Sequence, residues 1–110
     1  MPAAADFFAI DMRVGTITHA EAFPEARKPS LKLEIDFGPE VGLLRSTAQL
    51  TMHYGPADLV GRQVIGVVNI GERRIAGFVS QVLVLGAMPQ QTEVVLLAPD
   101  QAVTNGTRIG

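Results

Sequence analysis

The chain has 110 residues, a formal net charge of −2 and no cysteine, and 47% of its residues are apolar. Its length and apolar content predict one folded domain, residues 1–110, and argue against disorder. The lack of cysteine excludes disulfides, thiolate metal sites and cysteine nucleophiles and is typical of the cytoplasm. The acidic balance excludes a general attraction to nucleic acid, so such binding would need a local basic patch.

No membrane insertion is expected from the apolar patterning. No apolar run approaches the roughly 20 residues that a membrane-spanning helix needs. The first residues lack the basic and apolar regions of a signal peptide, so a cytoplasmic location is predicted.

The first predicted element is a short helical turn capped by Asp6, with Phe7 and Phe8 among its apolar residues. This turn either covers the core or contacts a second subunit. A strand is predicted at residues 11–20, which are rich in β-branched side chains. Gly15 within it suggests a bulge or bend, as a closing barrel requires.

The clearest strand covers residues 31–37, where apolar residues at odd positions alternate with charged residues at even positions. A proline-bounded loop at residues 23–29 precedes it. A turn at residues 38–42 leads to an antiparallel partner at residues 43–50. Arg45 within that partner is charged, so its side chain is expected to reach a rim or groove.

One short helix is predicted at residues 54–61, with Pro56 in its first turn and Gly61 just after its last. Further strands are predicted at residues 63–69, 82–85 and 93–98, and an Asn105-Gly106 turn precedes residues 107–109. Five strands with one helix after the third predict an all-β OB-fold barrel, at about residues 11–86. The strands predicted after Gly86 are additional to the five strands of that barrel.

Two adjacent arginines, Arg73 and Arg74, lie in a loop between two predicted strands. They form either a solvated hairpin tip or a fork for phosphate or carboxylate groups. Neighbouring residues on an extended chain point to opposite sides, so both arginines face one ligand only if the loop curls. Gly71 and Gly77 permit that curl.

Two residues flanking this pair have two interpretations each. Phe78 is either a core side chain or an exposed ring for stacking. Asn69, at a strand end, either binds a ligand or caps the backbone of the loop.

No pattern in the sequence favours catalysis. His19 and His53 are far apart and have no paired ligands, so no metal site is predicted. Ser80 lacks the G-x-S-x-G frame of a nucleophile. The glycines fit neither a P-loop nor a dinucleotide fingerprint, so no cofactor is expected. The sequence therefore favours a binding module over an enzyme.

An ordered set of motifs spans nearly the whole chain. It consists of Asp11-x-Arg13-Val14-Gly15, the loop around Pro24, Leu33-x-Ile35-Asp36-x-Gly38, Leu59-x-Gly61, Val67-Val68-Asn69, Arg73-Arg74-Ile75, Gly77 and Ser80-Gln81. The set resembles the tRNA-binding OB domain of methionyl-tRNA synthetases and of endothelial monocyte-activating polypeptide-like proteins. Val82-Leu83 stands where tRNA-binding members of that superfamily usually have Gly-Met.

Within that superfamily the chain resembles the CsaA type, an export-related chaperone that works as a homodimer. The likeness is carried by Phe23-Pro24-Glu25-Ala26-Arg27, Arg73-Arg74-Ile75-Ala76-Gly77-Phe78 and the ending from Val94 to Asp100. It implies a non-catalytic protein that binds unfolded or pre-export polypeptide. It also suggests an export motor ATPase as a partner. The alternative is a tRNA-binding protein that uses the same loop.

The candidate residues follow from the patterns and the resemblance together. The ligand-binding set is Arg45, Asn69, Arg73, Arg74, Phe78, Ser80 and Gln81. The dimer-interface set is Phe7, Phe8, Val94, Val95, Leu96 and Leu97. Residues from about 87 to 110 are the expected dimerisation extension. Four consecutive apolar residues give its strand two apolar faces, and one chain covers only one of them.

Overall fold

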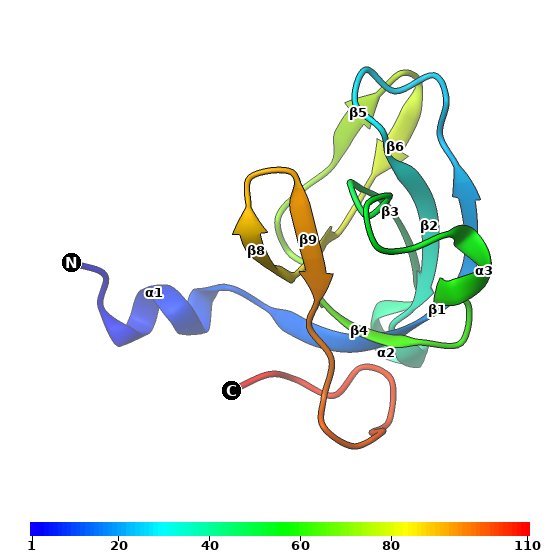
Figure 1. Cartoon of the computed structure of the whole chain (residues 1–110). Coiled ribbons are helices and arrows are strands. Elements are labelled where there is room, and N and C mark those ends of the chain that lie inside the picture. Colours follow the sequence, from blue (N-terminus) through cyan, green and yellow to red (C-terminus); the bar gives the residue numbers. More distant parts are fainter.

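A computed structural model describes all of residues 1–110 and contains one five-stranded antiparallel sheet (Figure 1). Its strands are β1 (Met12–Ala22), β2 (Leu31–Asp36), β3 (Leu43–Ala48), β4 (Gln63–Val67) and β7 (Leu83–Val84). They lie in the order β3-β2-β1-β4-β7. The sheet curls into a nearly closed barrel, which confirms the all-β OB fold predicted from the sequence.

Three short helices and two hairpins are added to the barrel. They are α1 (Ala4–Ala9), α2 (Gly38–Val41), α3 (Pro56–Leu59), the hairpin of β5 (Arg73–Ile75) with β6 (Phe78–Ser80), and the hairpin of β8 (Gly86–Gln90) with β9 (Glu93–Leu96). The predicted helix is confirmed as α3, whose first residue is Pro56. The turn predicted at residues 38–42 also winds into a further short helix, α2. None of these helices is long and apolar enough to span a membrane.

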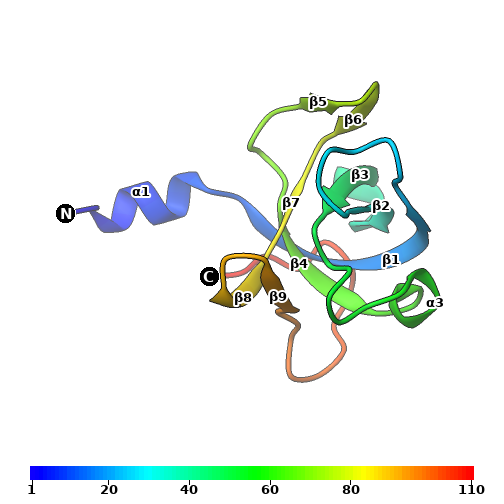
Figure 2. The same ribbon diagram turned by 45° about the horizontal axis from the view of Figure 1, so that its top comes forward.

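Helix α1 extends away from the barrel (Figures 1 and 2). It begins at Ala4, ahead of the predicted cap, and Asp6 instead accepts a 2.8 Å hydrogen bond from the Ala3 N–H. None of its residues is buried. The interpretation of this segment as a cover for the core of its own chain is therefore wrong.

The edges of the barrel meet where β3 faces the segment before β7. Ser46 on β3 is fully buried, and its hydroxyl donates a 2.9 Å hydrogen bond to the backbone oxygen of Val82. Val82 is itself only 3% exposed. A buried hydroxyl and a buried carbonyl satisfy each other here, which holds the barrel closed at this point.

The core is built on the alternating strand, as predicted. The apolar residues of that stretch, Leu31, Leu33, Ile35 and Phe37, are each no more than 3% exposed. The irregularity expected at Gly15 lies further along, where the pairing of β1 with β2 shifts between Ile17 and His19. Gly15 instead permits close packing, because an added Cβ would lie 2.7 Å from Ile35 Cγ2.

The C-terminal residues return to the barrel beside β1. The Val14 N–H donates to the Thr107 oxygen and the Ile109 N–H donates to the Met12 oxygen, each at 2.9 Å. This segment lies within the extension from about residue 87 that was expected to serve dimerisation. Several of its backbone groups are hydrogen-bonded within its own chain, so part of the expected extension completes the barrel of the chain to which it belongs.

An ion pair fastens the start of β1. The Arg13 Nε lies 2.6 Å from Asp11 Oδ1, and Arg13 Nη1 donates to the Gly106 oxygen at 3.0 Å. The hydrogen bond from Arg13 lowers the pKa of Asp11 below its ordinary value of 3.8. The same bond raises the pKa of Arg13.

Asp11→Asn is expected to lower stability at neutral pH and to make it less sensitive to acid. A carboxyl whose pKa is lowered by folding stabilises the fold above its unfolded pKa, and this contribution is lost as pH falls through the folded value. The difference in free energy of unfolding between wild type and variant should thus be full above about pH 5 and shrink below about pH 4. Urea unfolding from pH 7 to pH 2.5 measures it, and a difference that stays constant over this range would contradict the assignment.

Candidate functional site

The two adjacent arginines lie in a β-hairpin rather than in an irregular loop. Strands β5 and β6 pair Arg73 with Ser80, Arg74 with Val79, and Ile75 with Phe78. Ala76 and Gly77 form the turn with φ values of 46° and 83°. Positive φ at both central residues is the geometry that joins two strands through a two-residue turn.

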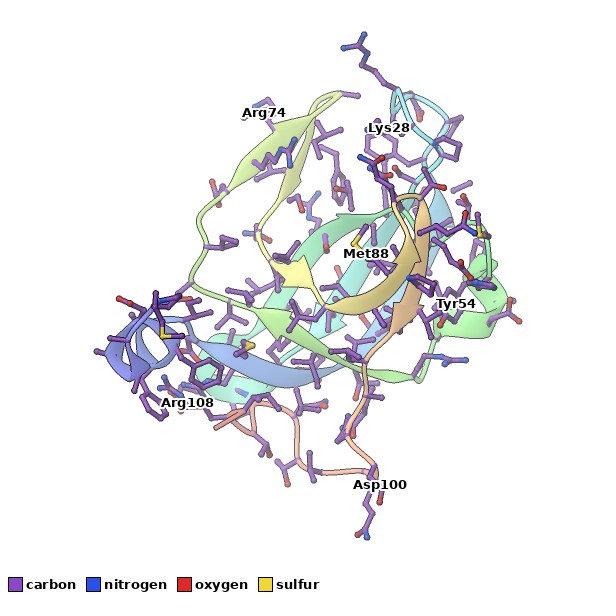
Figure 3. The ribbon with its side chains drawn as sticks, turned by 60° about the vertical axis from the view of Figure 1, so that its left-hand side comes forward. Lys28, Tyr54, Arg74, Met88, Asp100 and Arg108 are labelled. Carbon is purple, nitrogen blue, oxygen red and sulfur yellow. The ribbon has the colours of Figure 1, made fainter.

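The hairpin register separates the two arginines. Directly paired residues share a face of a hairpin, and neighbours along a strand alternate. Arg73 and Ser80 therefore share a face, and Arg74 lies on the opposite one. Figure 3 shows Arg74 on the hairpin, at the end of the molecule that also carries Lys28. The curl that would direct both arginines to one ligand is absent, because the segment is extended.

A first cavity of about 300 Å³ lies beside the hairpin. Its lining residues are Thr47, Ile70, Gly71, Glu72, Arg73, Ile75, Ser80, Val82 and Leu83. Apolar and polar groups share this lining, with Arg73 and Glu72 as its charged members. Of the predicted ligand-binding residues, Arg73 and Ser80 meet here.

A second cavity of about 230 Å³ lies over the outer face of β1, β2 and β3. Its lining residues are His19, Glu21, Lys32, Leu33, Glu34, Arg45 and Phe78. Arg45 reaches this groove as expected, with its guanidinium carbon 5.6 Å from the centre of the Phe78 ring. Phe78 is half-buried and forms one wall, so it lies between the two roles considered for it.

The sequence reasoning missed Lys32, which lines this second cavity, and Phe23, which packs against the Phe78 wall of the cavity. The Phe23 ring packs edge-on against Phe78 at a centroid distance of 5.7 Å. The Lys32 ammonium lies 4.6 Å from the Phe23 ring centre and 5.3 Å from that of Phe78. Both distances are typical of cation–π contacts. The available signal was the position of Lys32 on the polar face of the alternating strand.

Ser80 and Gln81 bind the edge of β3. The Thr47 N–H donates to Ser80 Oγ at 3.2 Å, and the Arg45 N–H donates to Gln81 Oε1 at 3.0 Å. The Gln81 N–H returns a 2.7 Å bond to the Arg45 oxygen. These bonds fix the hairpin to the barrel, and the Ser80 hydroxyl proton remains able to donate into the first cavity.

Asn69 lies outside both cavities and fastens the N-terminal helix. Its Oδ1 accepts a 2.9 Å bond from the Asp11 N–H, and its Nδ2 donates a 2.8 Å bond to the Ala9 oxygen. Arg108 also donates to the Phe8 oxygen at 3.0 Å. The end of α1 is therefore held to the segment that follows β4 and to the C-terminal segment.

The predicted interface residues separate into packed and exposed groups. Val94 and Leu96 on β9 pack against the core. Val95 and Leu97 are 40% and 42% exposed, and Phe8 is 60% exposed. One face of β9 therefore packs against its own barrel, whereas Val95 on the other face and Leu97 just beyond the strand remain exposed.

Comparison with known proteins identifies the class to which this fold and site belong. The model of the putative tRNA binding domain family matches residues 12–108, so the chain belongs to that family. The chain is 33% identical over 104 residues to a methionine–tRNA ligase of Bacteroides fragilis and 34% identical over 100 residues to that of Methanocaldococcus jannaschii. These matches cover 94% and 91% of this chain, but the chain spans only 15% of the length of either ligase.

Solved structures show which type of protein within this family the chain resembles. Chaperone CsaA from Bacillus anthracis str. Ames is 52% identical, with a TM-score of 0.95 and coverage of 100% of this chain and 99% of that one. The CsaA chaperone protein from Picrophilus torridus is 42% identical, with a TM-score of 0.92 and full coverage of both chains. A MetRS-related protein from Pyrococcus horikoshii is 25% identical, covers 100% and 98% of the two chains, and has a TM-score of 0.87. Within the family, this chain is a CsaA-type protein.

Proposed function

We propose that this protein is a non-catalytic, cytoplasmic, homodimeric chaperone that binds unfolded or pre-export polypeptide beside the β5–β6 hairpin. The observation that supports it is the first cavity, whose lining joins apolar side chains to Arg73 and Ser80. Such a mixture suits polypeptide, because apolar groups accept side chains and polar groups fix the chain. The CsaA chaperones that this chain resembles over its whole length favour the same function.

In this mechanism an aliphatic side chain of the client enters the first cavity against Val82 and Leu83. Arg73 binds a carboxylate or backbone carbonyl of the client, and the Ser80 hydroxyl donates a further hydrogen bond. Two sites in one dimer raise the effective concentration for a single long client. No nucleotide motif is present in the sequence, so holding requires no ATP, and an export motor ATPase is the proposed recipient of the client.

The proposal predicts that an excess of the protein slows the aggregation of a chemically denatured client without ATP. Arg73→Ala should weaken client binding about tenfold, because a charged hydrogen bond contributes about 1.5–3 kcal/mol and the site is partly exposed. Arg74→Ala, on the opposite face of the same strand, should leave binding unchanged. Light scattering of the client and the affinity of a labelled unfolded polypeptide measure both effects. If folded Arg73→Ala binds the labelled polypeptide with wild-type affinity, Arg73 does not bind the client and is only a solvated surface residue.

A tRNA-binding function is the second candidate. It is favoured by the family match and by the two cations, Lys32 and Arg45, placed at the Phe78 ring. Rings and cations of this kind stack bases and bind phosphates. Salt separates the two functions, since binding of tRNA weakens steeply with salt through counterion release, whereas apolar peptide binding weakens little.

A further inference from the structure

The two cavities are separated by a wall that is one residue pair wide. On the hairpin, Ile75 lines the first cavity and its cross-strand partner Phe78 lines the second. On β3, Thr47 lines the first cavity and Arg45, two residues earlier on the same face, lines the second. Cross-strand partners and same-face neighbours lie about 5–7 Å apart. The cavities are therefore adjacent subsites under one hairpin.

The two subsites differ in chemistry. The apolar lining of the first comes from Ile70, Ile75, Val82 and Leu83. The second brings the Lys32 ammonium and the Arg45 guanidinium to within 5.3 and 5.6 Å of the Phe78 ring centre. An aliphatic side chain suits the first subsite, and a group that two cations attract suits the second.

Neither Lys32 nor Arg45 forms an ion pair within the chain. Its ion pairs join Arg13 to Asp11 and Glu40, His19 to Glu21, and His53 to Glu93. The two carboxylates of the second cavity are cross-strand partners of these cations, Glu21 of Lys32 and Glu34 of Arg45. Both are directed elsewhere, because Glu21 Oε1 lies 3.1 Å from His19 Nε2 and Glu34 Oε1 accepts a 3.3 Å hydrogen bond from the Thr18 hydroxyl. The two cations remain free for an incoming carboxylate, the planar anion that arginine binds best.

We infer that the preferred client segment is an extended chain with an aliphatic side chain and an acidic side chain two residues apart. This inference rests on the proposed polypeptide-binding function. Side chains at i and i+2 of an extended chain point to one face and lie about 6.7 Å apart, within the range of about 5–7 Å expected between the residues that line the two subsites. The aliphatic group enters the first cavity, and the carboxylate meets Lys32 and Arg45 in the second.

The test uses fluorescence anisotropy with labelled, unfolded peptides on a glycine-serine background. One peptide carries Leu-x-Glu, a second carries Leu-x-Gln, and a third shifts the glutamate by one position to Leu-x-x-Glu. The full-length protein should bind the first about tenfold more tightly than the second, because a charged hydrogen bond is lost. It should bind the third about as weakly as the second, because the carboxylate then points to the other face.

A charge reversal provides the matched variants. Arg45→Glu should reverse the preference, so that Leu-x-Lys binds more tightly than Leu-x-Glu. Arg74→Glu makes the same charge change on the outer face of the hairpin and should retain the wild-type preference. If both variants lose the preference for Leu-x-Glu, the overall charge of the protein and not a local contact sets that preference. The assignment of the peptide carboxylate to the second cavity would then be wrong.

Other outcomes separate this inference from the function on which it rests. Equal affinity for all three peptides, with aggregation still suppressed, overturns the inference and leaves the chaperone function standing. Absence of both peptide binding and aggregation suppression overturns both. If tRNA binds instead, with a steep salt dependence, loses affinity in Arg45→Glu and is not displaced by Leu-x-Glu, the cations serve nucleic acid and the inference fails.

Discussion

Phe37→Ala is expected to destabilise the fold by about 3–5 kcal/mol, the usual cost of removing a buried aromatic ring. Phe37 is fully buried in the hydrophobic core. Two glycines on neighbouring strands make room for its ring, because an added Cβ would lie 2.8 Å from the ring at Gly15 and 2.9 Å from it at Gly66. The loss would be a large part of the 5–15 kcal/mol typical of a domain.

Urea unfolding measures this cost, and a double-mutant cycle tests its origin. Gly15→Ala alone should be strained, because its methyl would lie 2.8 Å from the Phe37 ring and 2.7 Å from Ile35 Cγ2. In the Phe37→Ala background the added methyl has room where the ring was. The double variant should therefore lose about 0.5–3 kcal/mol less free energy of unfolding than the sum of the losses in the two single variants. Met52→Ala, which removes an exposed side chain, should change stability by no more than about 0.5 kcal/mol. Strict additivity would show that Gly15 does not make room for the ring.

The barrel could be predicted from the sequence because its signals are local. The stretch at residues 31–37 alternates perfectly, and a strand with one buried face must do so. Pro56 and Gly61 bound α3 because proline suits the first turn and Gly61 adopts a φ of 90° beyond the last. Each signal acts within a few residues, so no knowledge of the rest of the fold was needed.

The hairpin could not be predicted because its strands are held by distant partners. Strands β5 and β6 have three residues each, with no alternation of apolar and charged side chains. Phe78 packs on Phe23, and Gln81 bonds to the backbone of Arg45, so the loop before β2 and the edge of β3 fix its position. Long-range contacts of this kind override local propensity.

For the same reason, only part of the candidate site can be predicted from the sequence. Arg73 and Ser80 were both named, but only the strand register brings them to one face. The sequence does not identify Lys32 as a binding residue, because a charged side chain on the outer face of a strand is ordinarily solvated. The position of Asn69 at a strand end is compatible with ligand binding or with backbone capping, but only the fold shows that its amide joins the segment after β4 to Ala9 and Asp11.

Exposed apolar residues beside the barrel indicate where two copies of the chain would meet. Helix α1 and the β8–β9 hairpin lie on the same side of the barrel in both ribbon views (Figures 1 and 2). The exposed apolar residues of these elements and of the residue following β9 are Phe7, Phe8, Met88, Val95 and Leu97. Exposed apolar side chains on one side of a molecule favour burial in a two-fold contact, in which the same surface meets its own copy. The anchoring of α1 by Asn69 and Arg108 would hold one part of that surface in place.

Val95→Asp and Leu97→Asp are each expected to convert a dimer into a monomer. Placing a carboxylate in an apolar contact leaves it without water or a partner, and a 100-fold weaker dimer would correspond to about 2.7 kcal/mol. Light scattering at micromolar concentration should give twice the 11.7 kDa chain mass for wild type and about the chain mass for each variant. Leu43→Asp, at an exposed apolar position on β3, is the matched control and should remain dimeric. A wild-type mass near 11.7 kDa would refute the arrangement, and circular dichroism of the variants distinguishes a folded monomer from an unfolded chain.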